Sequence, residues 1–246
     1  MKGLVPGRVA GFVALVALSA AVILMGPISG HASFDVSRDA FSISNSPGWC
    51  FAMTAFARWY YLTRQDAPPL RKVLDKRSQQ RIASELQGYY SKNLIKIQAD
   101  YCNQYVRNQN EYFRRFVTGL VCGEPRIVLL MNKGPRGAVL HAVLAYAWIP
   151  EENSIKVYDP NYNNSERVID LEKKEYTSLD ITYNAICFPE VFHDHAALVS
   201  KMKQLHATFA AGSARTASAT PVSADTPRIT RVRSDSSIGK ESIGIR

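Results

Sequence analysis

The sequence lacks the patterns that mark zinc-binding, nucleotide-binding and RNA-binding domains. It has no zinc-finger spacing of cysteine and histidine, no glycine-rich phosphate loop and no aromatic RNA-binding motif. The formal net charge is +9, but the basic residues form no long block, which favours a solvated basic surface and no nucleic-acid partner. The two histidines of the HDH stretch, residues 193–195, have no further ligand nearby, so we expect neither a metal nor a cofactor.

Cysteine is scarce, with Cys50, Cys102, Cys122 and Cys187 in a chain of 246 residues. This density excludes a small scaffold that depends on disulfides for its stability. In an oxidising compartment, four cysteines would form two disulfides, and the sequence allows three pairings. We favour Cys102 with Cys122, because both flank one helical stretch, whereas Cys187 lies in an apolar strand where it can be a buried thiol.

Long apolar runs are also few, and the one that stands out lies at the N-terminus. Lys2 and Arg8 precede a run of about 17 apolar residues, 9–25, and small residues follow it as far as Ala32. This order is typical of a secretory signal, and the alternative is an N-terminal membrane anchor in residues 1–33. We therefore expect an exported protein, periplasmic or secreted, with possible membrane attachment through this segment.

The remaining chain predicts helices first and an antiparallel sheet afterwards, which is the order of an α+β domain. We expect one domain over residues 34–210, with residues 34–45 as a polar lead-in. The helical spacing of apolar residues predicts helices over 50–63, 70–87, 92–118 and 190–210. Short apolar runs bounded by turn residues predict strands over 126–132, 138–149, 153–160, 166–171 and 178–188. Residues 211–246 are rich in Ser, Thr and Ala and predict a disordered basic tail.

Cys50 lies in the stretch SNSPGWCFAMTAFARWYY, residues 44–61, where a Pro-Gly turn leads into an aromatic-rich helix. A helix that begins near Cys50 would point its free N–H groups and the positive end of its dipole at the sulfur. Such a position favours the thiolate form that a nucleophile needs. A cysteine at a helix start can equally be a small buried residue.

His141 and Asp159 supply the other two groups that a thiol nucleophile requires. His141 lies mid-strand among Val, Leu and Ala, and a buried imidazole without a partner would cost about 1–3 kcal/mol. Asp159 follows 18 residues later at the end of the next predicted strand, so a hairpin can return it to the histidine. Each residue alone has an ordinary structural explanation, a core histidine or an Asp-Pro turn. Together with Cys50 they form the pattern of a nucleophilic triad.

The motifs GWCFAMTAFARWY, HAVLAYAW and VYDPNY, in this order, resemble the papain-like cysteine peptidases. The resemblance is to the bacterial branch with aspartate as the third member, which includes the YopT-like effector peptidases and the peptidase domains of bacteriocin exporters. It implies a papain-like fold, in which an N-terminal helical lobe carries the cysteine and packs on an antiparallel sheet that carries the histidine and aspartate. It also implies Cys50 as nucleophile, His141 as general base and then acid, and Asp159 as the group that orients the histidine.

The papain pattern places an oxyanion glutamine six residues before the cysteine, and here that position is Ser44. Asn45 is the nearest amide, so the resemblance makes it the candidate oxyanion-hole residue. The expected function is that of a thiol hydrolase, which cleaves peptide or isopeptide bonds of a peptide or protein substrate through a thioester acyl-enzyme. Two alternatives remain open, a transglutaminase-like acyltransferase and a catalytically inactive papain-fold binding domain.

Overall fold

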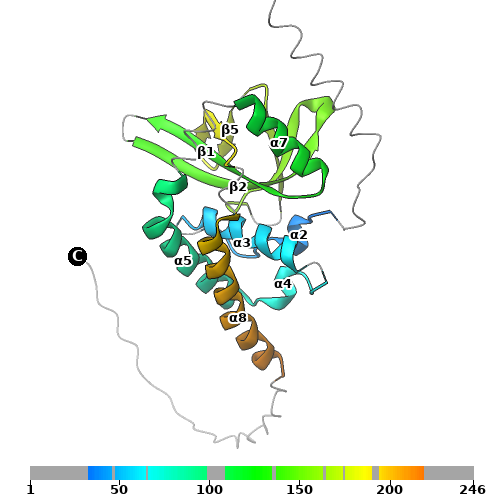
Figure 1. Ribbon diagram of the computed structural model, residues 1–246, viewed down its shortest axis with the longest axis vertical. Coiled ribbons are helices and arrows are strands. Elements are labelled where there is room, and N and C mark those ends of the chain that lie inside the picture. The colour runs from blue at the N-terminus through cyan, green and yellow to red at the C-terminus, as the bar shows by residue number, and fades with distance from the viewer. Residues whose placement is uncertain are drawn as a thin grey trace, which may run out of the picture.

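A computed structural model describes residues 33–45, 48–64, 66–98, 109–134, 137–162, 165–173, 175–189 and 194–218 (Figure 1). The apolar run expected to be a signal or an anchor lies outside these residues. Within the described part of the chain, no helix is both long and apolar enough to cross a bilayer.

The described helices are α2 (Val36–Asp39), α3 (Cys50–Thr63), α4 (Leu70–Val73), α5 (Lys76–Asn93), α7 (Gln109–Val121) and α8 (Ala196–Ser218). Helix α3 has the bounds that the apolar spacing predicts. The single helix predicted over 70–87 is wrong, because the Asp75 side chain accepts a hydrogen bond from the Ser78 N–H and starts a new helix there. Residues 99–108 of the helix predicted over 92–118 lie outside the described residues, and α7 covers its last part.

The strands form one large and one small antiparallel sheet, so the α+β prediction is confirmed. They are β1 (Arg126–Gly134), β2 (Gly137–Ile149), β3 (Ser154–Tyr158), β4 (Glu166–Asp170), β5 (Tyr176–Ser178), β6 (Ile181–Tyr183) and β7 (Ala185–Cys187). The larger sheet has the order β4-β3-β2-β1-β7, and β5 and β6 pair as a separate hairpin. The run predicted as strand over 178–188 is thus divided among three strands.

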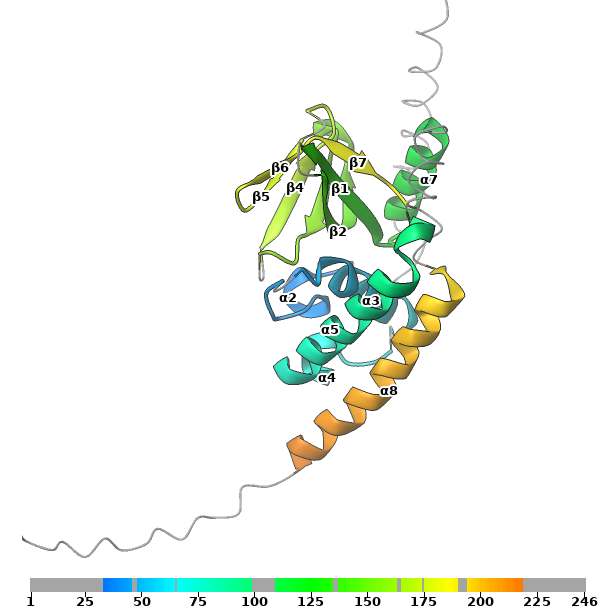
Figure 2. The same cartoon turned by 90° about the vertical axis from the view of Figure 1, so that its left-hand side faces the viewer.

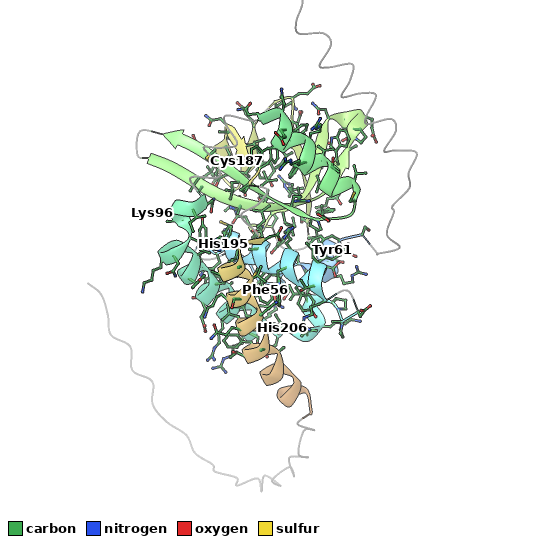
Figure 3. All side chains as sticks on the ribbon, viewed as in Figure 1. Phe56, Tyr61, Lys96, Cys187, His195 and His206 are labelled. Carbon is green, nitrogen blue, oxygen red and sulfur yellow. The ribbon has the colours of Figure 1, made fainter. Side chains whose placement is uncertain are left out.

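The large sheet buries apolar side chains on both faces, and different helices cover the two faces. Ala142 and Leu144 of β2 join the cluster that contains α3, α5 and α8, whereas the alternate residues Val143 and Ala145 join the cluster under α7. Figure 2 shows α3 directly below the sheet, with α5 and α8 beneath it and α7 beside the sheet. In Figure 3, Phe56 of α3 and His206 of α8 lie in this helical layer. Helices α3, α5 and α8 therefore form one layer on which the sheet packs through α3, and α7 packs against the opposite face of the sheet.

Residues 34–45 are not a polar lead-in, and that prediction is wrong. Phe34, Phe41 and Ile43 are buried in the helical core, although their spacing has no helical or strand period. The Arg71 guanidinium of α4 donates hydrogen bonds to the carbonyl oxygens of Val36, Ala40 and Phe41. This segment is therefore fixed by burial and by one arginine, and its only regular structure is the single turn of helix α2.

The C-terminal boundary also differs from the expectation. The sequence predicts that the last helix ends near residue 210, but α8 continues to Ser218, into the range expected to be a disordered tail. Residues 219–246 of that tail lie outside the described residues. Ala-rich sequence favours helix even where few large apolar side chains are present, which explains the extension.

No two cysteines of the described chain are paired. Cys50 and Cys122 are free thiols, and Cys102 lies outside the described residues. Cys187 is fully buried on β7, and Figure 3 shows it in the sheet layer. Cys122 follows α7 and is exposed.

Candidate active site

Cys50 is the first residue of α3, at the end of a tight turn. Gly48 has a φ of 83°, in the left-handed region that glycine adopts without the steric cost of a Cβ. The N-cap residue Trp49 makes no side-chain hydrogen bond to the helix. Instead, Oε1 of Gln87 on α5 accepts a hydrogen bond from the Ala52 N–H at 3.1 Å. The half-buried thiol thus lies beside helix N–H groups that are not all used by the helix itself.

The rest of α3 holds this end in place by burial. All residues from Phe51 to Tyr60 are buried, so the helix packs on all sides and not through one stripe. Phe51 stacks on Tyr90 of α5 with ring centroids 3.9 Å apart. The Thr54 hydroxyl donates to the Cys50 carbonyl at 3.0 Å, which ties the first turn together. The position of the Cys50 backbone is therefore set by the core of the helical layer.

His141 lies on β2 and is 3% exposed, and Asp159 follows the end of β3 and is fully buried. Their side chains meet, with 2.7 Å between His141 Nε2 and Asp159 Oδ1. The two strands are antiparallel neighbours, paired from Leu144 with Tyr158, which brings the end of β3 alongside the start of β2. The pair is therefore an ion pair or strong hydrogen bond in a buried site.

Both oxygens of Asp159 have further donors. The hydroxyl groups of Ser178 and Tyr176 donate to Oδ2 at 2.7 and 2.8 Å. The backbone N–H of Asn161 donates to Oδ1 at 2.9 Å. A carboxylate with this many donors is favoured in its charged form even though it is buried. The β5–β6 hairpin supplies two of these donors and so acts as a support for the carboxylate.

Cys50 is close enough to His141 for its thiol to be one of the groups that raise the pKa of the histidine. Because Nε2 of the histidine faces Asp159, Nδ1 is the ring nitrogen left for the thiol. The site therefore combines a direct contact between His141 and Asp159 with a nearby thiol. This order, thiol to imidazole to carboxylate, is the arrangement in which an imidazole can exchange a proton with a sulfur while a carboxylate fixes its orientation.

The protonation of the pair follows from these contacts. Burial lowers the pKa of His141, but its hydrogen bonds with Asp159 and Cys50 and the charges of these groups outweigh burial and raise the pKa to about 9. Burial raises the pKa of Asp159, but the hydrogen bond and charge of His141, with the Ser178 and Asn161 donors, bring it below its ordinary value. The imidazolium is therefore favoured at neutral pH, beside a charged carboxylate.

Asn45, the candidate oxyanion-hole residue, lies near this network. Its backbone N–H donates to the Pro160 carbonyl at 3.0 Å, and its side-chain Nδ2 donates to Oδ1 of Asn161 at 2.7 Å. Its own Oδ1 is buried without a partner among the described residues. Asn161 in turn donates to the Ser178 hydroxyl at 2.8 Å. Asn45 thus connects the segment before Cys50 to the loop after Asp159.

Several residues of the site are not singled out by any sequence pattern. They are Gln87, Asn161, Tyr176, Ser178 and Tyr183. Tyr176 and Ser178 are two residues apart on β5, so their side chains lie on the same face of the strand. This spacing can be read from the sequence. Nothing in the pattern of that strand indicates that this face contacts Asp159, because the hairpin belongs to a separate sheet.

No group of metal-binding side chains occurs in the part of the chain that the structure describes. His193 of the HDH stretch lies outside the described residues. Asp194 forms an ion pair with the buried Arg58 of α3 at 2.8 Å. The stretch therefore contributes a structural contact between the start of α8 and the core.

Comparison of this chain with protein-family models, with curated proteins and with solved structures finds no match in any of the three. The candidate function therefore rests on the residues of the site.

Proposed function

We propose that this protein is a papain-like thiol hydrolase that cleaves peptide or isopeptide bonds through Cys50, His141 and Asp159. The observation that carries the proposal is the 2.7 Å contact between His141 and Asp159 beside a thiol that raises the pKa of the same histidine. A buried His–Asp pair alone is common as a structural element. A thiol at a helix N-terminus, close enough to influence the same imidazole, is the further feature that favours nucleophilic catalysis.

In the proposed reaction, His141 holds the proton that the Cys50 thiol gives up. The thiolate attacks the carbonyl carbon of the substrate, and the carbonyl oxygen takes up the negative charge. The C–N bond then breaks, and the imidazolium protonates the departing amine, which leaves a thioester on Cys50. The neutral His141 next takes a proton from water as the water oxygen attacks the thioester. The C–S bond breaks, the acid is released and the thiolate–imidazolium pair is restored.

Asp159 has a positioning role in this scheme. Its buried carboxylate holds one ring nitrogen, so the other remains directed at the sulfur. Its charge stabilises the imidazolium that forms when the thiol loses its proton. The Ser178 and Tyr176 hydroxyls keep the carboxylate oriented and charged.

A library of fluorogenic peptide amides tests the proposal directly. The full chain should release the fluorophore, and Cys50→Ala should abolish release, because it removes the thiol that attacks the substrate. Cys122→Ala is the matched control, since it removes an exposed free thiol that follows α7 and is not a residue of the candidate site, and it should retain activity. Release that survives in Cys50→Ala contradicts the proposal.

The same assay separates the two alternatives from hydrolysis. A fluorescent primary amine added to the reaction would be incorporated into the peptide by a transglutaminase-like acyltransferase, whereas a hydrolase releases the free acid. A chain that gives neither product, and binds the same peptides equally well after Cys50→Ala, would be an inactive binding domain.

We further propose that residues 1–33 direct export. The support is that Phe34, two residues after the predicted cleavage near Ala32, is buried in the core, so cleavage there would leave the core residues in the mature chain. Mass measurement of the chain recovered from an exporting bacterial host tests this, with a mature N-terminus near residue 33 expected. A full-length chain retained inside the cell contradicts it.

A further inference from the structure

Tyr183, at the end of the β5–β6 hairpin, lies against the catalytic histidine. Its ring stacks on the His141 ring, with centroids 5.7 Å apart and planes 25° apart. The residue is 3% exposed and belongs to the apolar cluster on the α7 side of the sheet. Within the described part of the chain, the Tyr183 hydroxyl has no hydrogen-bond partner. The hydroxyl oxygen is not one of the fully buried polar atoms that lack a partner, so it is an accessible part of a side chain that is otherwise buried.

We propose that the Tyr183 hydroxyl donates a hydrogen bond to the substrate carbonyl oxygen as this oxygen becomes negative. The inference rests on the proposed function and names a catalytic group that it leaves unassigned. A thiol hydrolase needs at least one donor for the oxyanion, and removal of such a donor typically slows the reaction by about 100-fold to 1,000-fold.

The electrostatic surroundings keep this hydroxyl in its donor form. Burial, followed by the charges of Cys50 and Asp159, raises the pKa of Tyr183 to about 12. Cys50 is one of the two charged groups that influence this hydroxyl, so the thiol and the hydroxyl lie within electrostatic reach of each other. At neutral pH the group is a neutral O–H and can donate to a new negative charge beside the sulfur.

The other amides near Cys50 are partly engaged. The Asn45 side-chain amide donates to Asn161. The Gln87 carbonyl accepts from the Ala52 N–H, which fixes the side chain but leaves its NH₂ group as a competing donor. Tyr183 differs from both of these amides, because its hydroxyl makes no hydrogen bond to a described residue and its ring is held in place by burial. The competing candidate for the test is therefore Gln87.

Tyr176 provides a matched control, because it is the cross-strand partner of Tyr183 in the same hairpin. Its hydroxyl donates to Asp159 and not toward the thiol. Tyr183→Phe and Tyr176→Phe each remove one hydroxyl and retain the ring, so both variants should fold. Thermal unfolding of each variant checks this.

Two small reagents separate oxyanion stabilisation from thiol activation. Iodoacetamide is attacked at its CH₂ carbon and forms no oxyanion, whereas p-nitrophenyl acetate must form one on the way to the acyl-enzyme. We expect Tyr183→Phe to lower the rate of Cys50 acylation by about 100-fold and to change its alkylation rate less than twofold. Tyr176→Phe should lower both rates together, because it acts through Asp159 and His141. Gln87→Met should leave acylation nearly unchanged.

The inference is overturned if Tyr183→Phe leaves the acylation rate unchanged. It is also overturned if Tyr183→Phe lowers the acylation and alkylation rates equally, because the tyrosine would then act only by holding His141 in place. A loss of acylation in Gln87→Met but not in Tyr183→Phe assigns the role to Gln87. In a different outcome, wild-type Cys50 reacts with neither reagent faster than free cysteine, and then the proposed function itself fails.

Discussion

The two halves of the candidate site differ in how firmly their polar groups are held. On the sheet side, Asp159 is fully buried and has partners from His141, Asn161, Tyr176 and Ser178. On the helix side, Cys50 is half-buried at a helix end that the Gln87 side chain caps from α5. The charge that orients the imidazole is thus fixed before a substrate arrives, whereas the thiol remains accessible. This division suits a nucleophile that must be both activated and reachable.

Removal of the carboxylate should have the largest effect, because it damages the firmly held half. Asp159→Ala leaves His141, Tyr176 and Ser178 without their buried acceptor. We expect the free energy of unfolding to fall by about 3–5 kcal/mol. Hydrolysis should slow by about 100-fold to 10,000-fold through loss of acid–base catalysis. Urea unfolding and peptide hydrolysis measure the two effects, and Asp180→Ala in the exposed hairpin turn is the control. If Asp159→Ala and Asp180→Ala lowered stability and hydrolysis equally, the claim that the sheet side of the site is firmly held through Asp159 would be wrong.

The pH dependence of stability tests the charge state of the same half. The pKa of His141 is raised to about 9 in the folded chain from an ordinary value of 6.5. The folded state therefore binds the extra proton between these values, and this stabilisation is complete below about pH 6.5 and is lost as the pH rises through about 9. At about 1.4 kcal/mol for each pKa unit, the loss amounts to about 3 kcal/mol. Wild type should lose this much relative to His141→Gln in urea unfolding across that range, and a constant difference would contradict the raised pKa.

Single hydroxyl removals should weaken the sheet half by smaller amounts. Ser178→Ala removes one donor to Asp159 within the buried network. We expect the free energy of unfolding to fall by about 1–3 kcal/mol, and the pKa of His141 in an NMR titration to fall toward 6.5. Thr177→Ala on the same strand is the control, because this exposed side chain contacts Thr182 and not the carboxylate. A control that costs as much as Ser178→Ala would show that the hairpin, not the hydrogen bond, is responsible.

The helix half should tolerate change better. Gln87→Leu removes the cap on the Ala52 N–H, and we expect a loss of about 1 kcal/mol in the free energy of unfolding. The alkylation rate of Cys50 should change little, because His141 and Asp159 are not affected. Ser84→Ala on the exposed face of α5 is the matched control in urea unfolding. A loss as large as that of Asp159→Ala would remove the difference between the two halves.

The sequence predicted the parts of the fold that depend on local periodicity. Helix α3 and the antiparallel sheet follow from apolar spacing and turn residues, which act over short distances. The contact between His141 and Asp159 was within reach of the sequence because two adjacent strands carry them. The prediction for residues 34–45 is wrong because helices distant in the sequence bury Phe34 and Phe41, and no local pattern indicates this burial. Tyr176 and Ser178 were missed for the same reason, since hydrogen bonds across 17 and 19 residues have no periodic signature.

The most direct test of the central claim compares two thiols of one chain. Cys122 is a free, exposed thiol, whereas Cys50 is less exposed but close enough to His141 to influence its pKa. Iodoacetamide labelling at neutral pH, followed by peptide mass spectrometry, gives both rates in the same sample. We expect Cys50 to react at least about ten times faster than Cys122, and His141→Gln to remove this advantage without a change at Cys122. Labelling of Cys50 that is no faster than Cys122, or that does not depend on His141, would contradict the account.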